Sequence, residues 1–510
     1  MKVNPMIPLV GCLALIAPVF GQEVEPEPVS FHREVRPLLQ EHCQGCHQPA
    51  KDSGDVMLLT HANLFSEIDG VPLVVPGHPG ESLLIDVVSP LGALAPAMPE
   101  DAAPLSEGDR ALLSRWIAEG ALDDSPTSLG EVPTPDNPPL YPALPVIRAL
   151  AFSPDGSSLA VSGRHEVLVH DVPALATGPP SPPRRLIGIS SRIESLRFSP
   201  DGTILAAAGG TPSLFGEVQL WRPHESKLLL SISVTYDTLH GLSWSPNGEL
   251  FAVGGSDHSL RAFDPKSGQQ VLFQGAHNGW VLGSTFSHDG THLISVGADR
   301  SAKLTKVDTE QFIDNITSIT PGALKGGLAA VELHPKEKQV LLGGADGEPK
   351  LYRIFREKDR QIGDDFNLVR AYAPLLGHVT DVGWASNGES FFASASLSIQ
   401  AGSVRGGAVR AYATQGEVLW TSQFGEAIYA LAVDPTGAYV AVAGFDGAVR
   451  LLDPASGQTL LEFEPVELQT LAPTAPRNAD TPAPAGLPST AENSSATGQG
   501  LDISTEGEQS

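Results

Sequence analysis

Two cysteines and a histidine lie close together near the N-terminus, in the stretch HCQGCHQPAK (residues 42–51). Cys43 and Cys46 are separated by two residues, and His47 follows directly. On a helical turn, residues at positions i, i+3 and i+4 share one face, so the two thiols and the imidazole converge. Three chemistries use paired cysteines at this spacing: zinc binding, thiol–disulfide exchange and covalent haem attachment.

Covalent haem attachment is the chemistry that uses all three side chains. A zinc site needs two further ligands, usually a second Cys/His pair, and the remaining cysteine, Cys12, lies in the leader described below. A redox Cys-x-x-Cys pair opens a βαβ unit, and no such unit surrounds this motif. We therefore predict a haem c, with Cys43 and Cys46 as attachment points and His47 as the proximal iron ligand. Zinc and a redox dithiol are the alternatives.

A second iron ligand decides whether a haem only carries electrons or also binds small molecules. Thioether ligation raises the reduction potential of an electron-transfer haem. Beyond the leader the chain has two methionines, Met57 and Met98. Met57 lies in the alternating run GDVMLL and is expected to pack, whereas Met98 lies in the loop LAPAMPED. We predict Met98 as the distal ligand, with His61 and His78 as the alternatives.

The first 21 residues have the pattern of a secretory signal peptide. Lys2 gives a positive start, an apolar run covers residues 6–20, and cleavage is expected near Gly21. The run continues past Cys12, which argues against lipid attachment there, and it is short for a membrane span. We expect an exported protein, periplasmic or otherwise extracytoplasmic, without membrane attachment. A lipidated Cys12 and an uncleaved anchor are the alternatives.

Two helical segments flank the candidate haem loops. The first opens at Ser30 and ends at the cysteine motif, and Pro37 predicts a kink or a late start within it. The second, LSEGDRALLSRWIAEGALDD, has Ser106 as its expected N-cap and an apolar face that includes Trp116. The two helices are expected to cross beside the haem, and Trp116 is expected to pack in the core.

Four stretches together resemble the planctomycete-type cytochrome c domain: FHREVRPLLQEHCQGCHQPAK, VVPGHPGESLLI, MPED and LSEGDRALLSRWIAEGALDD. The resemblance covers residues 30–124 and implies a small all-α domain with a c-type haem. It implies the same roles for the two cysteines and His47, and Met98 matches the family's methionine-proline element. Asp55 stands where the family usually has a glycine, a departure that concerns a turn.

The composition indicates a largely β protein with an acidic surface. A chain of 510 residues exceeds the size at which a single core stops growing, so we expect more than one domain. Lys and Arg total 32 against 59 Asp and Glu, a net charge of −27. This charge repels phosphate backbones and argues against nucleic acid as a partner, whereas a basic redox partner would suit it. The 52 glycines and 44 prolines indicate many tight turns.

One pattern recurs seven times after a Pro-rich linker at residues 125–143. Each copy has an apolar strand, a turn related to Ser-Pro-Asp-Gly, and further short strands. A repeat of roughly 40–45 residues with four short strands is typical of a propeller blade. We predict an all-β seven-bladed propeller over residues 144–466, followed by a disordered tail at 467–510. The copies have equivalent positions at Phe152, Phe198, Trp244, Phe286, Leu333, Trp384 and Val433.

The copies resemble WD repeats. A GAH tripeptide, a later Gly-His pair and strand ends such as VQLWRP carry the likeness, and Trp221 alone keeps the signature tryptophan. WD-type propellers mostly bind proteins, so the resemblance implies a protein partner on the propeller. Either QTLLEFE or PPLYPAL is expected to complete the last blade. Residues 356–374 and 396–407 are expected to be insertions that project from one rim or side.

These features lead to three functional hypotheses. In the first, an exported c-type cytochrome carries one covalent haem for outer-sphere electron transfer, and the propeller docks a protein partner. In the second, the haem reports redox state or a gas to the propeller. In the third, an enzyme uses an open iron site; a single haem motif, and the lack of a concentrated His/Asp/Glu set for the propeller channel, speak against it. We favour the first, an electron carrier rather than a catalyst.

Overall fold

The structure is a computed structural model that describes residues 27–469, except for 49–50, 53–55, 93, 101–102, 126–132, 178–181, 319–324, 360, 362–364 and 399–404. Backbone contacts divide the chain into Met1–Gln469 and Thr470–Ser510, and every described residue belongs to the first unit. The predicted signal peptide, part of the predicted linker, Asp55 and nearly all of the predicted tail lie outside the described residues.

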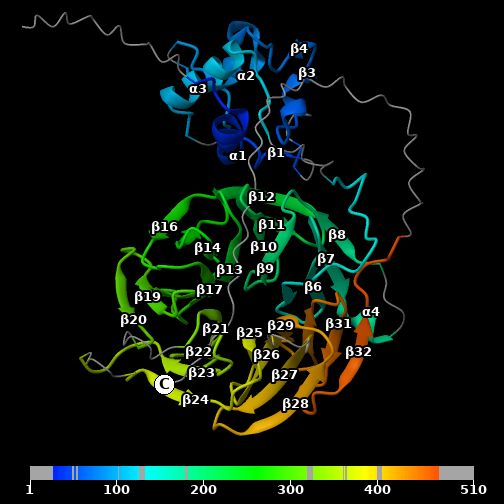
Figure 1. The fold of residues 1–510 in the computed structure, drawn as a ribbon, viewed down its shortest axis with the longest axis vertical. Helices are drawn as coiled ribbons and strands as arrows, with labels where there is room; N and C mark the ends of the chain where they lie inside the picture. Colours follow the sequence, from blue (N-terminus) through cyan, green and yellow to red (C-terminus); the bar gives the residue numbers. More distant parts are fainter. Residues whose placement is uncertain are drawn as a thin grey trace, which may run out of the picture. The chain divides into compact units, whose positions relative to one another are not determined.

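The N-terminal region consists of short helices and two small antiparallel strand pairs (Figure 1). Its elements are η1 (Phe31–Val35, a π-helix), α1 (Arg36–His42), β1 (His47–Gln48), β2 (Lys51–Asp52), η2 (His61–Phe65), β3 (Glu67–Ile68), β4 (Val71–Pro72), η3 (Pro79–Glu81), α2 (Leu83–Val88) and α3 (Glu107–Ala118). Strand β1 pairs with β2, and β3 pairs with β4. The prediction of an all-α domain is therefore supported only in part.

Both predicted helical segments are present, and serine side chains cap them. The Ser30 hydroxyl accepts a hydrogen bond from the Arg33 N–H at 2.9 Å, and Ser106 Oγ accepts one from the Asp109 N–H at 3.1 Å. Pro37 lies in the first turn of α1, directly after η1 ends. A proline is tolerated there because the first N–H groups of an α-helix have no partner within it.

One apolar cluster joins these helices. Buried side chains from η1 and α1 share it with side chains from α3: Phe31, Val35, Leu38, Leu39, Leu113, Trp116 and Ile117. Cys43 and Met98 come from two different loops, and both pack against this cluster while remaining partly exposed. The core therefore positions the start of the cysteine motif and the predicted distal ligand on the same apolar body.

Residues 150–463 contain seven four-stranded antiparallel sheets, arranged as the blades of a propeller (Figure 1). The blades are, in chain order, β5–β8 (Leu150–Phe152, Ser158–Ser162, Glu166–Asp171, Arg184–Ile187), β9–β12 (Arg192–Phe198, Leu205–Thr211, Phe215–Arg222, Lys227–Thr235), β13–β16 (Leu239–Trp244, Phe251–Gly255, Leu260–Phe263, Gln270–Gln274), β17–β20 (Val281–Phe286, His292–Gly297, Ala302–Lys306, Phe312–Asn315), β21–β24 (Leu328–Leu333, Gln339–Gly344, Lys350–Arg353, Leu368–Ala371), β25–β28 (His378–Trp384, Ser390–Ser398, Arg405–Ala413, Val418–Phe424) and β29–β32 (Ile428–Val433, Val440–Gly444, Val449–Leu452, Thr459–Phe463). The predicted all-β seven-bladed propeller is confirmed.

The seven equivalent positions of the repeat are the last residues of the seven first strands, from Phe152 in β5 to Val433 in β29.

The turn after β5 shows what the repeated motif does. The Gly156 N–H donates to the Ser153 carbonyl at 2.9 Å, and Ser153 Oγ donates to Asp155 Oδ1 at 2.5 Å. Serine, proline, aspartate and glycine are therefore turn-forming residues here, as the sequence predicts.

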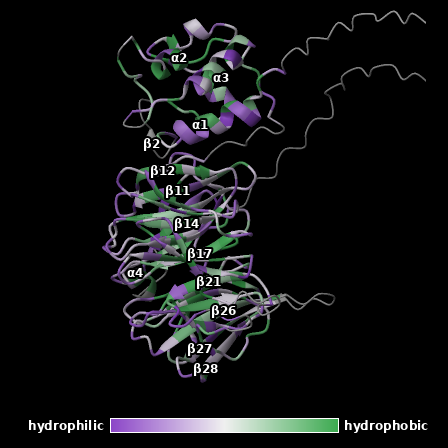
Figure 2. Ribbon diagram, turned by 90° about the vertical axis from the view of Figure 1, so that its left-hand side faces the viewer, coloured by the Kyte–Doolittle hydropathy of each residue, from purple (hydrophilic) through white to green (hydrophobic). Residues whose placement is uncertain are grey.

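The second strands of the blades are buried on both faces. Every residue of β6, β14 and β30 is buried. Figure 2 shows hydrophobic residues along strands such as β14 and β17, whereas hydrophilic residues lie mostly on the connecting loops. Adjacent blades cover one another, which explains why these strands have continuous apolar runs instead of an alternating pattern.

The seventh blade is completed by its own chain segment. Strand β32, which lies within QTLLEFE, pairs with β31, and Leu461 lies opposite Leu451. The alternative stretch, PPLYPAL, forms no strand. The ring instead closes by side-chain packing, because Leu150 and Leu168 of the first blade share a buried cluster with Ala441 and Leu451 of the seventh.

The first predicted insertion is in part a blade strand. Residues 356–374 contain β24, the outer strand of the fifth blade, so the prediction of a projecting loop was wrong there. The reason is that β24 lies largely exposed and lacks the apolar run of the inner strands. The second, 396–407, lies at the end of the long β26–β27 hairpin, where residues 399–404 lie outside the described residues.

Within the described part of the propeller, one helix was not predicted. Helix α4 (Val172–Thr177) follows β7 in the first blade, and its buried Val172 and Leu175 join the cluster that closes the ring. The helices are short throughout, and within the described part of the chain none is long and apolar enough to cross a membrane.

Candidate functional site

The cysteine motif folds as a hydrogen-bonded turn directly after α1. The Cys43 carbonyl accepts hydrogen bonds from the N–H groups of Cys46 and His47, each at 3.1 Å. Helix α1 ends at His42, and His47 begins β1, so a turn rather than a continuous helix links the three residues. Neither cysteine forms a disulfide; Cys43 is half-buried and Cys46 is exposed.

The His47 side chain is oriented by a backbone carbonyl. Its Nδ1 atom lies 3.2 Å from the carbonyl oxygen of Val56. A carbonyl oxygen only accepts hydrogen bonds, so Nδ1 carries the proton and Nε2 presents its lone pair. The residue is 9% exposed, and the Leu58 N–H donates to its carbonyl at 3.2 Å. A hydrogen bond on one ring nitrogen is how proteins prepare the other nitrogen as a metal ligand.

The environment of Cys43 differs from that of a redox dithiol. Burial raises the pKa of the Cys43 thiol to about 12, and the nearby Cys46 thiol raises it further. Reactive Cys-x-x-Cys pairs need the opposite, a lowered pKa that provides a thiolate. Among the described residues, no group of three or more His, Cys, Asp and Glu side chains is arranged to hold a metal ion. The raised pKa of the Cys43 thiol therefore does not favour the dithiol alternative.

The two methionines lie in different surroundings. Met98 is partly buried against the same apolar cluster that Cys43 contacts. Its N–H donates to the Val87 carbonyl at 2.8 Å, which anchors the loop to the last turn of α2. Met57 lies between the buried residues Val56 and Leu58, in a segment without regular secondary structure. Met98 therefore combines a loop position with contact to the apolar cluster that Cys43 also contacts.

The two alternative histidines have other contacts. The Nε2 atom of His61 lies 2.7 Å from the Ala121 carbonyl oxygen, and its ring packs edge-on against Phe31 at a centroid distance of 4.9 Å. The side chain of His78 is 62% exposed, and its Nδ1 lies 3.9 Å from Glu81. His61 thus stabilises the contact with the chain after α3, and His78 lies at the surface.

The first strands of the propeller bring together charged side chains that sequence reasoning missed. Arg148 Nε lies 3.2 Å from Glu194 Oε2, and Arg197 Nη2 lies 3.7 Å from Glu332 Oε2. Burial raises the pKa of Glu332 to about 7, although the charge of Arg197 opposes this shift. Burial likewise raises the pKa of Asp381.

The expectation that the channel has no concentrated acidic set is therefore only partly right. Three carboxylates gather there, but arginines pair with two of them. Arg148, Glu194, Arg197 and Asp381 line one cavity of about 100 Å³. These four residues belong to three different blades, so no local sequence pattern predicts that they lie together.

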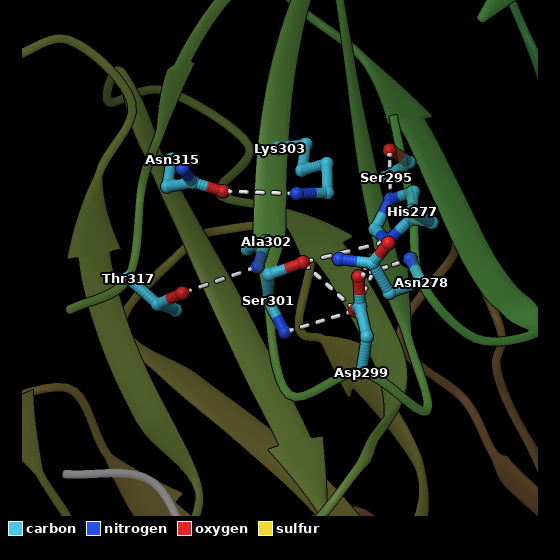
Figure 3. A network of polar contacts seen from close by, with 9 residues as sticks. All are labelled: His277, Asn278, Ser295, Asp299, Ser301, Ala302, Lys303, Asn315 and Thr317. Atoms are coloured by element: carbon cyan, nitrogen blue, oxygen red, sulfur yellow. Dashed lines mark hydrogen bonds and ion pairs between the residues drawn. The ribbon is translucent and has the colours of Figure 1, made fainter. Parts of the chain in front are cut away.

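A polar network in the fourth blade holds the loop before β17 (Figure 3). His277 Nδ1 lies 3.0 Å from both carboxylate oxygens of Asp299, and its Nε2 lies 2.8 Å from Ser295 Oγ. Burial opposes ionisation of Asp299, but the hydrogen bond with His277 holds its pKa well below the usual range. Because both ring nitrogens have partners, the network is structural and offers no free ligand atom.

Two families match parts of the chain. The model of the family described as planctomycete cytochrome C matches residues 43–99, which extend from Cys43 to just beyond Met98. The model described as WD domain, G-beta repeat, matches residues 226–264, 268–305 and 417–453. The second match includes strands of the second, third, fourth, sixth and seventh blades. Both resemblances stated from the sequence are confirmed.

Curated relatives are similar over short stretches. WD repeat and SOCS box-containing protein 1 of Danio rerio is 35% identical over 100 residues, 19% of this chain and 24% of that protein. The protein of the same name from Mus musculus is 35% identical over 95 residues, 18% and 23% of the two chains. WD repeat-containing protein 1 of Bos taurus is 31% identical over 77 residues, 14% and 13%. The chain spans about a quarter or less of the length of these relatives.

Proposed function

We propose that the protein is an exported c-type cytochrome, which carries one covalent haem for outer-sphere electron transfer and uses its propeller to dock a protein partner. The observation that carries this proposal is the turn of Cys43, Cys46 and His47 in a segment that matches planctomycete cytochrome C. Covalent attachment needs one thiol for each vinyl group and a histidine directly after the second cysteine.

The residues around the turn fit a haem. Cys43 and Met98 contact one apolar cluster, which suits a largely apolar macrocycle. Cys43 and Cys46 would hold the haem through thioether bonds, His47 would bind the iron through Nε2, and Met98 would supply the other axial ligand. When bound, the haem supplies a one-electron iron(III)/iron(II) couple.

The protein side chains tune and shield this couple. Donation from His47 Nδ1 to the Val56 carbonyl fixes the imidazole tautomer and increases its basicity as a ligand. A thioether from Met98 would raise the reduction potential and close the iron to exogenous ligands. The partly buried positions of Cys43 and Met98 limit the access of water on that side.

The propeller is the proposed docking platform. Its relatives are named for WD repeats, and proteins of this architecture present broad surfaces for other proteins. A net charge of −27 favours a basic redox partner, because opposite charge increases the rate of association. The secretory pattern of residues 1–21 supports export to a periplasmic or other extracytoplasmic compartment.

Production of the full chain together with a cytochrome c maturation system tests this proposal. We expect the exported protein to keep its haem after denaturation, with the mass of the polypeptide plus one haem. Cys43→Ser combined with Cys46→Ser should abolish covalent haem, whereas Met57→Leu should leave it unchanged. A protein that is exported and folded but carries no covalent haem would contradict the proposal.

A further inference from the structure

A second cavity of the propeller lies at the junction of its first two blades. It has a volume of about 340 Å³, and its lining includes Arg148, Arg164, Arg192 and Glu194 beside the apolar side chains of Val146 and Ile193. The lining comes from three places: the segment before β5, the β6–β7 turn, and the start of β9. Cavities at the lower end of the 300–1,000 Å³ range hold small organic ligands.

A buried carboxylate stabilises the turn that carries Arg164. The side chain of Glu166 is fully buried. It accepts hydrogen bonds from Arg185 Nε at 2.6 Å and Nη2 at 2.7 Å, and from the Tyr141 hydroxyl at 2.7 Å. The Arg164 N–H in turn donates to the Tyr141 hydroxyl at 3.0 Å. The backbone that presents Arg164 is therefore held in place before any ligand arrives.

The other two arginines also lie on a rigid backbone. Arg192 is the first residue of β9 and pairs with Gly210 of β10. The Arg148 N–H donates to Ser162 Oγ at 2.9 Å, and its guanidinium lies 5.1 Å from the centroid of the Tyr429 ring. Binding groups on a fixed scaffold lose little conformational entropy when a ligand binds.

The cavity is positive within a strongly acidic protein. Three arginines face a single carboxylate, Glu194, and that carboxylate is paired with Arg148 at 3.2 Å. Among the described residues, neither Arg164 nor Arg192 forms an ion pair, although the chain has 59 Asp and Glu against 32 Lys and Arg. Burial lowers the pKa of His165, and the charge of Arg164 lowers it further. Two exposed guanidinium groups are therefore left to bind an anion.

We propose that this cavity binds a ligand with two carboxylate groups joined by a short methylene chain. The planar fork of a guanidinium matches a carboxylate with two hydrogen bonds, so Arg164 and Arg192 would each take one carboxylate. Val146, which is exposed, provides an apolar contact for the methylene groups between them. A free dicarboxylic acid and a pair of acidic side chains from a protein both have this chemistry. None of the lining residues belongs to the cysteine motif or to the Met98 loop.

Isothermal titration of the full chain at low salt tests the site with two probes, glutarate and an acetylated Glu-Glu dipeptide amide. We expect saturable binding of at least one probe, and no binding of the corresponding uncharged amides. Arg164→Gln and Arg192→Gln should each weaken binding by roughly tenfold or more, because each removes a charge-assisted bidentate contact. Arg370→Gln, an exposed arginine on β24, makes the same charge change elsewhere and should alter affinity less than about twofold.

The outcomes separate the sources of the ligand and test the site itself. Tighter binding of glutarate assigns the cavity to a free acid, and tighter binding of the dipeptide assigns it to acidic side chains of a partner protein. Absence of saturable binding by both probes would overturn the proposal. Wild-type affinity in folded Arg164→Gln and Arg192→Gln proteins, with unchanged urea unfolding, would overturn it equally.

Discussion

The Nδ1 atom of His47 lies 3.2 Å from the carbonyl oxygen of Val56, nine residues further along the chain. This contact joins the cysteine turn to the extended segment that follows it, and it decides the tautomer of the imidazole. With the proton on Nδ1, the lone pair of the ring lies on Nε2. Both the residue types and this hydrogen bond therefore suit the ligand role that we propose for His47.

Substitution of Met98 should open the iron of the haem-loaded protein. Met98→Ala removes the thioether, so we expect the weak long-wavelength absorbance band of methionine–iron(III) ligation to disappear. The reduction potential should fall, since thioether ligation raises it, and the reduced protein should bind carbon monoxide. Optical spectra and a redox titration measure these changes.

The matched control for that experiment is Met57→Ala, which removes a methionine from the neighbourhood of the motif without touching the Met98 loop. It should keep the band and the closed iron. Ready binding of carbon monoxide by the wild-type protein would contradict Met98 ligation. The gas-sensor and open-iron hypotheses would then take precedence over electron transfer.

His170 should make the propeller sensitive to acid. It lies in β7, 2% exposed, with its ring 5.1 Å from Phe463, and within the described residues neither ring nitrogen has a hydrogen-bond partner. Burial lowers its pKa to about 4. The pKa of a histidine in an unfolded chain is about 6.5. At a pH between the folded and the unfolded pKa, the unfolded chain binds the proton and the folded chain does not. The free energy of unfolding therefore falls as the pH drops through this range.

The size of this effect follows from the difference of about 2.5 pKa units, worth about 3 kcal/mol at 1.36 kcal/mol per unit. His170→Leu should remove that part of the pH dependence between pH 6.5 and 4, as measured by urea unfolding. His224→Gln, at an exposed turn, should leave the dependence as it is. An unchanged slope in His170→Leu would show that the imidazole is protonated equally in both states.

The buried carboxylate Glu166 should contribute strongly to stability. Glu166→Gln leaves Arg185 without its two charge-assisted hydrogen bonds. It also removes the charged acceptor of the hydrogen bond from the Tyr141 hydroxyl. Removing one partner of a buried pair costs about 3–5 kcal/mol, and we expect about 3 because Arg185 is 30% exposed. Urea unfolding of Glu225→Gln, which breaks an exposed pair with Arg222, should show a change below about 1 kcal/mol.

The parts of this structure that the sequence predicts are those determined locally. Cys43 and His47 lie on one turn, in which the His47 N–H donates to the Cys43 carbonyl at 3.1 Å. The blades are predictable because every copy must bury its second strand on both faces and close a tight turn. Strand β24 escaped prediction because it lies at an exposed blade edge, where pairing with β23 determines it instead of an apolar run.

The charged groups of the channel were not predicted from the sequence, for a different reason. Arg197 and Glu332 are far apart in the chain, on β9 and β21, and lie 3.7 Å from each other only because the ring of blades closes. The positive cavity has the same origin, since Arg164 and Arg192 come from two neighbouring blades. A contact of this kind depends on the radius and the closure of the propeller. The length of the sequence repeat predicts neither property.

Gly241 should report directly on how closely the first strands pack around the channel. It has φ +56°, and a Cβ there would lie 2.5 Å from the Cα of Gly283 and 2.7 Å from its backbone nitrogen, in the next blade. Gly437, in the turn after β29, has φ +80° and open space where its Cβ would lie. Gly437→Ala therefore carries only the left-handed backbone penalty of about 1–2 kcal/mol. Gly241→Ala carries that penalty and also a collision with the backbone of the next blade. We therefore expect it to lower the free energy of unfolding by about 2 kcal/mol more than Gly437→Ala does, as measured by urea unfolding. Equal losses for the two variants would show that the blades separate easily at this point.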